Sequence, residues 1–245
     1  MSLHKRPAEI AVPVSLRHKD LKEVILMTNQ MTELVCILDR SGSMAGLERD
    51  TIGGYNAMLE KQREIEGDCR ITTVLFDNEY EIFHDRIDMK GVRPLTEKDY
   101  AVGGSTALLD AIGKTIYKIG NAQKHTAEKY RAQKVMFVII TDGEENSSRE
   151  FTSRKVKSMI QRQKSEYGWE FIFLGANIDA VETAAKFGIS PDRAQDYHAD
   201  SEGVNLNFRV MSNTVATYRA CAAMPENWKE EIREDYQKRG GRGKS

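Results

Sequence analysis

The sequence predicts a single α/β domain, a doubly wound, Rossmann-like, three-layer arrangement around a mostly parallel sheet. Apolar runs of strand length alternate along the chain with segments whose apolar residues recur at helical spacing. Two runs, 33–39 and 134–142, are almost continuously apolar, as expected of strands that helices cover on both faces. Asp77 and Asn78 separate two neighbouring runs as a tight turn would. One edge strand is therefore expected to be antiparallel.

Each element follows from its own pattern. The predicted strands are 33–39, 70–77, 79–84, 134–142 and 169–176. The predicted helices are marked by apolar stripes at spacings of three and four, namely Ile52, Tyr55, Met58 and Leu59; Leu109, Ile112, Ile116 and Ile119; Val156, Met159 and Ile160; and Val204, Phe208, Met211, Val215 and Tyr218. Each stripe predicts a helix that packs its apolar face against the sheet.

The composition shifts divide the chain into three parts. Residues 1–30 are weakly patterned and are expected to form an N-terminal extension that is disordered or carries a short helix over 19–26. Residues 31–222 form the predicted domain, and residues 223–245 form a charged C-terminal helix or tail, expected to be solvated. The terminal Gly-Lys-Ser is not a phosphate-binding loop, because that motif needs a further glycine six residues before the lysine, where this chain has Lys238.

The composition also limits the class of function. The 36 basic and 37 acidic residues nearly cancel, so no general attraction to nucleic acid or to an anionic membrane is expected. No apolar run is long enough for a transmembrane helix, and the N-terminus lacks the pattern of a secretory signal. Cys36, Cys69 and Cys221 have no metal-type spacing and are expected to be small buried residues in a reducing compartment. A cytoplasmic location is therefore predicted.

Three loops carry oxygen ligands at positions where ligands bind in open parallel sheets, beyond the carboxyl ends of the strands. The first is 39-DRSGSM-44 and the second is 103-GGSTALLDA-111. The third, 141-TDGEENSS-148, follows the most apolar strand. Their candidate ligands are Asp39, Ser41 and Ser43 in the first loop, Thr106 in the second and Asp142 in the third.

Each loop alone has an ordinary explanation as a helix cap or a turn. Together they indicate a cation site, because Asp39 and Asp142 would repel each other unless a cation lay between them. The other candidate ligands are hydroxyls, and no histidine or cysteine lies nearby in the sequence. Such hard oxygens favour Mg²⁺, Mn²⁺ or Ca²⁺ over zinc or copper.

The pattern of D-x-S-x-S, a threonine after a glycine-rich loop and an aspartate after an apolar strand resembles the metal-ion-dependent adhesion site (MIDAS) of von Willebrand factor A domains. The runs GGSTALLDAIG, TDGEEN and FLGAN are similar to those of small bacterial proteins of this type. The resemblance implies that Ser41, Ser43 and Thr106 bind the metal directly and that Asp39 and Asp142 often act through water.

Further residues border these loops. Ser105 is expected to cap the following helix or to lie on the rim, and Asp110 to interact with the helix dipole rather than with metal. Met44, Glu144 and Glu145 are expected on the rim, where they would contact a partner protein.

The predicted function is a metal-dependent protein-binding module and not an enzyme. Its cation would accept an acidic residue of a partner protein. The resemblance to von Willebrand factor A domains implies an intracellular assembly, such as one with an AAA+ ATPase. The first alternative is a metal-dependent hydrolase of phosphate esters, although Ser41 stands where a haloacid-dehalogenase-type phosphatase requires an aspartate. The second alternative is a scaffold that the metal only stabilises.

Overall fold

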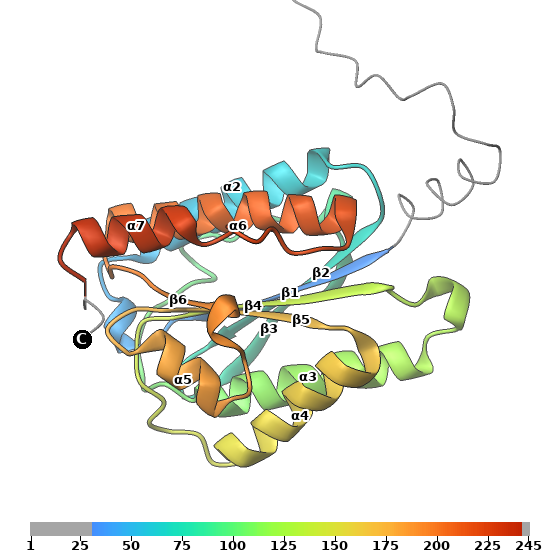
Figure 1. The fold of residues 1–245 in the computed structure, drawn as a ribbon, viewed down its shortest axis with the longest axis horizontal. Helices are drawn as coiled ribbons and strands as arrows, with labels where there is room; N and C mark the ends of the chain where they lie inside the picture. Colours follow the sequence, from blue (N-terminus) through green and yellow to red (C-terminus); the bar gives the residue numbers. More distant parts are fainter. Residues whose placement is uncertain (1–30, 242–245) are drawn as a thin grey trace, which may run out of the picture.

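The computed structural model describes residues 31–241. The predictions for residues 1–30 and for the last residues of the tail, 242–245, lie outside the described residues. A six-stranded sheet lies between two layers of helices (Figure 1). Helices α2, α6 and α7 cover one face, and α3, α4 and α5 cover the other.

The sheet has the predicted architecture. Its strands are β1 (Thr32–Asp39), β2 (Cys69–Phe76), β3 (Tyr80–Asp88), β4 (Lys134–Thr141), β5 (Glu170–Gly175) and β6 (Ala194–Asp196). Their order is β3-β2-β1-β4-β5-β6, and every neighbouring pair is parallel except β2 and β3. The antiparallel edge strand predicted from the Asp77-Asn78 turn is thus confirmed. Strand β6 was not predicted, because three residues are too few for an apolar run to stand out.

The four predicted stripes all lie in helices that pack on the sheet. The helices are α2 (Glu48–Glu64), α3 (Leu108–His125), α4 (Ser153–Tyr167), α5 (Ala180–Lys186), α6 (Ser201–Cys221) and α7 (Glu230–Lys238). Short 3-10 helices cover Gly42–Met44, Met89–Gly91, Glu128–Tyr130 and Pro191–Arg193. Within residues 31–241, none of the helices combines the length and apolar character needed to cross a bilayer.

Strand β1 lies in the middle of the sheet, and all eight of its residues are buried. Leu34 and Leu38 pack in the core beneath α2 and α6, whereas Val35 and Ile37 pack in the core beneath α3 and α4. Alternate side chains of a strand point to opposite faces of the sheet, so a strand that lies between two cores is apolar along its central residues, here 34–38.

Helices α2 and α6 approach each other closely at Gly54. A Cβ atom at this position would lie 2.5 Å from Cδ2 of Phe208. The ring of Phe208 therefore occupies the space that a side chain on α2 would need. This contact explains why a glycine is present in the middle of a helix, where it costs about 1 kcal/mol relative to alanine.

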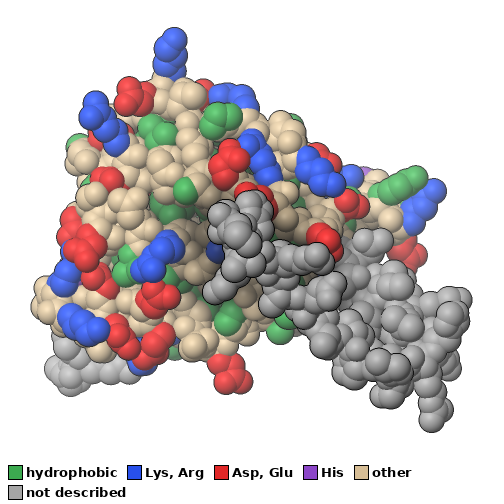
Figure 2. Space-filling model, turned by 90° about the horizontal axis from the view of Figure 1, so that it is seen from above, with side chains coloured by type: hydrophobic (Ala, Val, Ile, Leu, Met, Phe, Trp, Pro, Cys, Tyr) green, Lys and Arg blue, Asp and Glu red, His purple; other side chains and the backbone are tan. Residues whose placement is uncertain are grey.

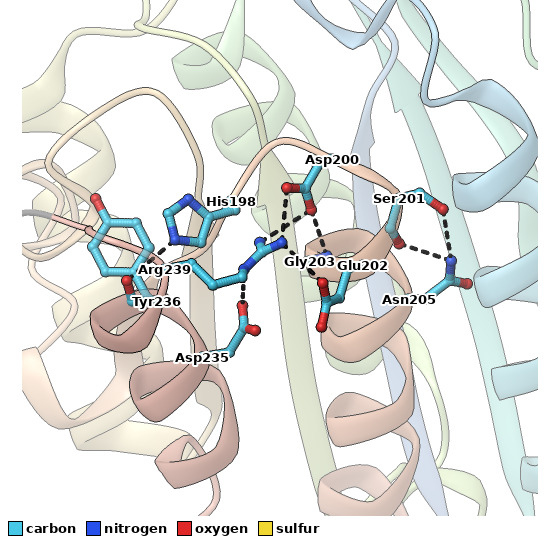
Figure 3. Close-up of polar contacts among 9 residues, drawn as sticks. All are labelled: His198, Asp200, Ser201, Glu202, Gly203, Asn205, Asp235, Tyr236 and Arg239. Carbon is cyan, nitrogen blue, oxygen red and sulfur yellow. Dashed lines mark hydrogen bonds and ion pairs between the residues drawn. The ribbon is translucent and has the colours of Figure 1, made fainter.

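Helix α7 belongs to the folded domain, which corrects the expectation of a solvated tail. Trp228 and Ile232 lie in the same core cluster as α6. The guanidinium of Arg239 pairs with both carboxylate oxygens of Asp200 at 2.9 and 3.1 Å (Figure 3). Asp200 also accepts a hydrogen bond from the N–H of Gly203 and so caps α6. Two buried apolar side chains and several ion pairs thus hold a segment whose sequence is largely charged.

The cysteines are unpaired, and only two of the three are buried as expected. Cys36 and Cys69 lie inside strands, whereas Cys221 is exposed at the end of α6. The helical face formed by α2, α6 and α7 carries acidic and basic side chains interspersed over the area that Figure 2 leaves uncovered.

Candidate functional site

The first and third predicted loops meet beyond the carboxyl ends of β1 and β4. These strands are adjacent and parallel, and Leu38 lies level with Ile140. The hydroxyl of Thr141 donates a hydrogen bond to Oδ2 of Asp39 at 2.6 Å. The N–H of Asp142 points to the same oxygen at 3.3 Å. The carboxylate of Asp39 therefore joins the two loops at their starting points.

The second loop is held between the other two. The N–H of Gly42 in the first loop donates to the carbonyl of Gly104 at 3.1 Å. On the other side, the N–H of Thr106 donates to the side-chain oxygen of Asn146 at 2.9 Å, and the N–H of Asn146 returns a bond to the carbonyl of Thr106 at 3.1 Å. Segments that are far apart in the sequence are thus joined by short, direct hydrogen bonds.

The alternating residues of the first loop are arranged around the carboxylate of Asp39. Its Oδ1 accepts a hydrogen bond from the N–H of Ser41 at 2.7 Å. The hydroxyl oxygens of Ser41 and Ser43 lie 3.1 Å apart. The phenol of Tyr100 donates to the backbone carbonyl of Asp39 from the adjoining segment. Hydrogen bonds therefore hold Asp39 both at its side-chain carboxylate and at its backbone carbonyl.

Hydroxyls from the first and second loops border one space at Gly143. A Cβ atom on Gly143 would lie 3.1 Å from Oγ of Ser43 and 3.2 Å from Oγ1 of Thr106. A side chain at this position would crowd both hydroxyls, so the glycine keeps the space between them open. Asp142, whose carboxylate is buried, directly precedes this glycine.

Asp142 has one oxygen bound and one without a partner. Its Oδ1 accepts a hydrogen bond from the side-chain amide of Asn177. Its Oδ2 is buried and accepts no hydrogen bond from any described residue. Burial raises the pKa of Asp142 to about 6, the bond from Asn177 opposes this shift, and the charge of Asp39 adds to it. An unpartnered buried carboxylate oxygen is costly, and a cation would satisfy it.

The pKa of Asp39 is shifted in the same direction as that of Asp142. Burial raises its pKa, while hydrogen bonds from Ser41 and Thr141 oppose the shift.

No three histidine, cysteine, aspartate or glutamate side chains within residues 31–241 are grouped so that they could hold a metal ion. A cation bound here would therefore use two carboxylates together with hydroxyls, a donor set that suits hard divalent ions.

No protein-family model and no curated protein sequence matches this chain. Solved structures do match. A von Willebrand factor type A protein from Catenulispora acidiphila aligns with a TM-score of 0.50 at 14% identity, over 77% of this chain and 43% of that one. Proximal thread matrix protein 1 from the mussel byssus, solved with a zinc-occupied MIDAS motif, aligns with a TM-score of 0.52 at 13% identity, over 77% and 46%. The fold is that of a von Willebrand factor A domain. The match to this chain covers less than half the length of either neighbour.

In this von Willebrand factor A fold, two residues predicted for the rim have other roles. Met44 is 2% exposed and packs in the core beneath α2 and α6, so the rim assignment is wrong for its side chain. The carboxylate of Glu145 accepts hydrogen bonds from the N–H groups of Leu109 and Ser148, both at 2.8 Å. Glu145 therefore caps helix α3 from the third loop and is not a free acid. Glu144 is exposed.

The start of α3 also differs from the prediction. Ser105 does not cap this helix, because the first free N–H groups are bound by Glu145 and by the hydroxyl of Ser148, which accepts from Asp110. Asp110 lies in the first turn of α3, as its predicted interaction with the helix dipole requires, and its carboxylate also accepts hydrogen bonds from the N–H groups of residues 149–151 at 2.8–2.9 Å. Burial alone would raise the pKa of Asp110, but these donors hold that pKa below its usual value.

Sequence reasoning missed the neighbours that orient the two aspartates. Thr141 ends strand β4, and a buried threonine in an apolar run is an ordinary strand residue. Tyr100 is far from Asp39 in the sequence and has no motif of its own. Asn177 offered a weak signal, since it ends the run FLGAN after a predicted strand. Its role depends on a contact with Asp142 that spans 35 positions.

Proposed function

We propose that this von Willebrand factor A domain is a protein-binding module that presents a divalent cation to an acidic residue of a partner. Asp39, Ser41, Ser43, Thr106 and Asp142 would hold the cation. The observation that carries the proposal is the space at Gly143, which hydroxyls of two loops border, together with the unpartnered, buried Oδ2 of the preceding residue, Asp142. A site built for hydrogen bonding alone would satisfy that oxygen from the protein.

The donor set supports a hard divalent cation, with Mg²⁺ first and Mn²⁺ or Ca²⁺ as alternatives. The byssus protein carries zinc at its MIDAS motif, so Zn²⁺ belongs among the ions to be tested. Three of the five ligands would be neutral hydroxyls, which leave most of the charge of the cation uncompensated. A bound cation with an open coordination position would therefore attract a carboxylate.

The partner would supply that carboxylate from an aspartate or glutamate side chain. Glu144, an exposed acid in the third loop, would then disfavour partners whose ligating residue is flanked by further acids. We propose an assembly with an AAA+ ATPase in the cytoplasm, as the resemblance to intracellular proteins with von Willebrand factor A domains implies. The unpaired cysteines are consistent with a reducing compartment.

The experiment measures cation binding first. Isothermal titration with Mg²⁺, Mn²⁺, Ca²⁺ and Zn²⁺ is run on the wild type, on Thr106→Ala and on Thr217→Ala. Thr217 is exposed on α6 and serves as the matched control for the same chemical change. We expect binding by the wild type and the control, and loss of binding in Thr106→Ala. Equal cation affinity in all three proteins would refute the site.

The second step separates a binding module from a metal-stabilised scaffold and from a hydrolase. The wild type is used to capture proteins from a lysate of its source organism, with and without chelator, while circular dichroism follows the fold. Capture that the chelator and Thr106→Ala both abolish, with the circular dichroism spectrum unchanged, supports the module. Unfolding upon chelation supports the scaffold instead, and metal-dependent turnover of a phosphate ester supports the hydrolase.

A further inference from the structure

A fourth loop, which none of the predicted ligands occupies, reaches the candidate site through Asn177. This residue follows strand β5 and has a φ of +56°, in the left-handed region that few residues other than glycine adopt. Asparagine tolerates this conformation better than most side chains do. The side chain of Asn177 donates its amide hydrogen to Oδ1 of Asp142, 35 positions earlier in the chain.

The loop that carries Asn177 is fixed on both sides. The N–H of Ala176 donates to the carbonyl of Thr141 at 3.0 Å, which ties the loop to the end of strand β4. Ile178 is buried in the core beneath α3 and α4. Asp179 caps helix α5 by accepting a hydrogen bond from the N–H of Glu182 at 2.7 Å. The amide of Asn177 is therefore presented by an anchored backbone.

The contact distinguishes between the two oxygens of Asp142. Oδ1 is occupied by the amide of Asn177, and Oδ2 is the buried oxygen without a partner. A hydrogen bond to one carboxylate oxygen restricts rotation about the last side-chain torsion, which is otherwise broad. The amide also carries no charge, so it orients the carboxylate without neutralising it. A lysine in its place would form an ion pair and compete with a cation.

We infer that Asn177 is a positioning residue, which turns Asp142 so that its Oδ2 is directed to the cation. The inference rests on the proposed function, because it assigns a role toward the cation of that site. Asn177 does not itself bind the ion; it acts through Asp142. Outer hydrogen-bond partners of this kind typically change metal affinity by about 10- to 100-fold when they are removed.

The test uses Asn177→Gly, which removes the amide but keeps the left-handed backbone accessible. Asn227→Gly, the same change at an exposed asparagine outside the site, is the matched control. Mg²⁺ affinity is measured by isothermal titration, and the thermal midpoint is measured on the metal-free proteins. We expect Asn177→Gly to bind Mg²⁺ at least about 10-fold more weakly than the wild type and the control, while its metal-free form stays folded, with a midpoint lowered only by the loss of one hydrogen bond to a buried carboxylate.

A metal-free crystal structure of Asn177→Gly supplies a readout independent of cation binding. We expect the carboxylate of Asp142 to adopt a different torsion or two alternate ones. Wild-type Mg²⁺ affinity in the variant would overturn the inference and leave the proposed function intact. Failure of the wild type to bind any divalent cation would instead refute the proposed function. In that case an unchanged orientation of Asp142 in the variant would still refute positioning by Asn177.

Discussion

The hydroxyl of Thr141 donates a hydrogen bond to the carboxylate of Asp39 at 2.6 Å, between the last residues of two adjacent parallel strands. This bond spans 102 positions in the sequence and lies where two loops of the candidate site begin. Asp39 is buried, so its carboxylate depends on such donors to remain charged. The carboxylate of Asp39 is therefore held by a hydrogen bond from the end of a neighbouring strand as well as by one from its own loop.

Thr141→Val removes this donor while preserving the shape of the side chain. We expect the free energy of unfolding to fall by roughly 1–3 kcal/mol, because a buried carboxylate oxygen loses a hydrogen bond. Urea denaturation in the presence of chelator measures it. The exposed Thr217→Val on α6 should change stability by no more than about 0.5 kcal/mol. An equally small change at Thr141 would contradict the structural importance of the bond.

Divalent cations should stabilise the fold by binding the native state alone. At a concentration 100 times the dissociation constant, the expected gain is about 2.7 kcal/mol in the free energy of unfolding. Thermal melts over a Mg²⁺ series, reversed with chelator, measure this effect. Asp39→Ala should show no dependence on Mg²⁺, whereas a midpoint that rises equally in the variant would place the binding elsewhere.

Two neighbouring glycines of α2 should respond to alanine with opposite signs. At Gly54 the new methyl would meet the ring of Phe208, and overpacking of this kind costs typically about 1–3 kcal/mol. At Gly53 a Cβ atom would meet nothing within 4 Å. Gly53→Ala should therefore gain roughly 0.4–1 kcal/mol from helix propensity and lost chain entropy. Chemical denaturation of both variants checks the pair, and the same sign in both would count against the α2–α6 contact.

Helix α7 should contribute to stability mainly through its apolar anchor. Ile232 is 1% exposed, and Ile232→Ala is expected to lower the free energy of unfolding by about 2–5 kcal/mol. Arg239→Ala removes ion pairs with Asp200, Glu202 and Asp235 and should cost less, roughly 1 kcal/mol, because two of these three acids are exposed to solvent. If Ile232→Ala unfolded at the same urea concentration as the wild type, α7 would not be part of the cooperative domain.

The stability of the protein should also depend on pH through His84. Burial lowers the pKa of this imidazole from 6.5 to about 4, in contact with the hydroxyls of Tyr55 and Thr73. The folded state therefore holds His84 neutral where the unfolded state would protonate it. Its contribution is fully present above pH 6.5 and is lost as the pH falls toward 4.

Urea denaturation between pH 4 and 8 measures this effect against His84→Gln, which cannot be protonated. The stability difference between the two proteins should change by at most about 1.4 kcal/mol per pH unit below pH 6.5 and stay constant above it. A difference that did not vary with pH would show that His84 titrates normally in the folded protein.

The fold and the candidate ligands could be predicted because their signals are local. A strand between two cores is apolar along its centre, as 34–38 is, and a helix on a sheet must repeat its apolar residues at spacings of three and four. The loops that follow parallel strands meet at one edge, so Asp39 and Asp142 could be placed near each other before any coordinates were known. The short strand β6 and the helix α5 escaped prediction because they hold too few residues to establish a period.

By itself, the sequence determined the alternation of strands and helices, the antiparallel edge and the set of oxygen-bearing loops. Only the tertiary structure decided which side chains were free at the site. Met44 proved to be a core residue, Glu145 a cap for a helix 36 positions earlier, and Asn177 a donor to Asp142. The physical reason is that a loop side chain has many polar partners within reach, and only the packing of distant segments selects among them.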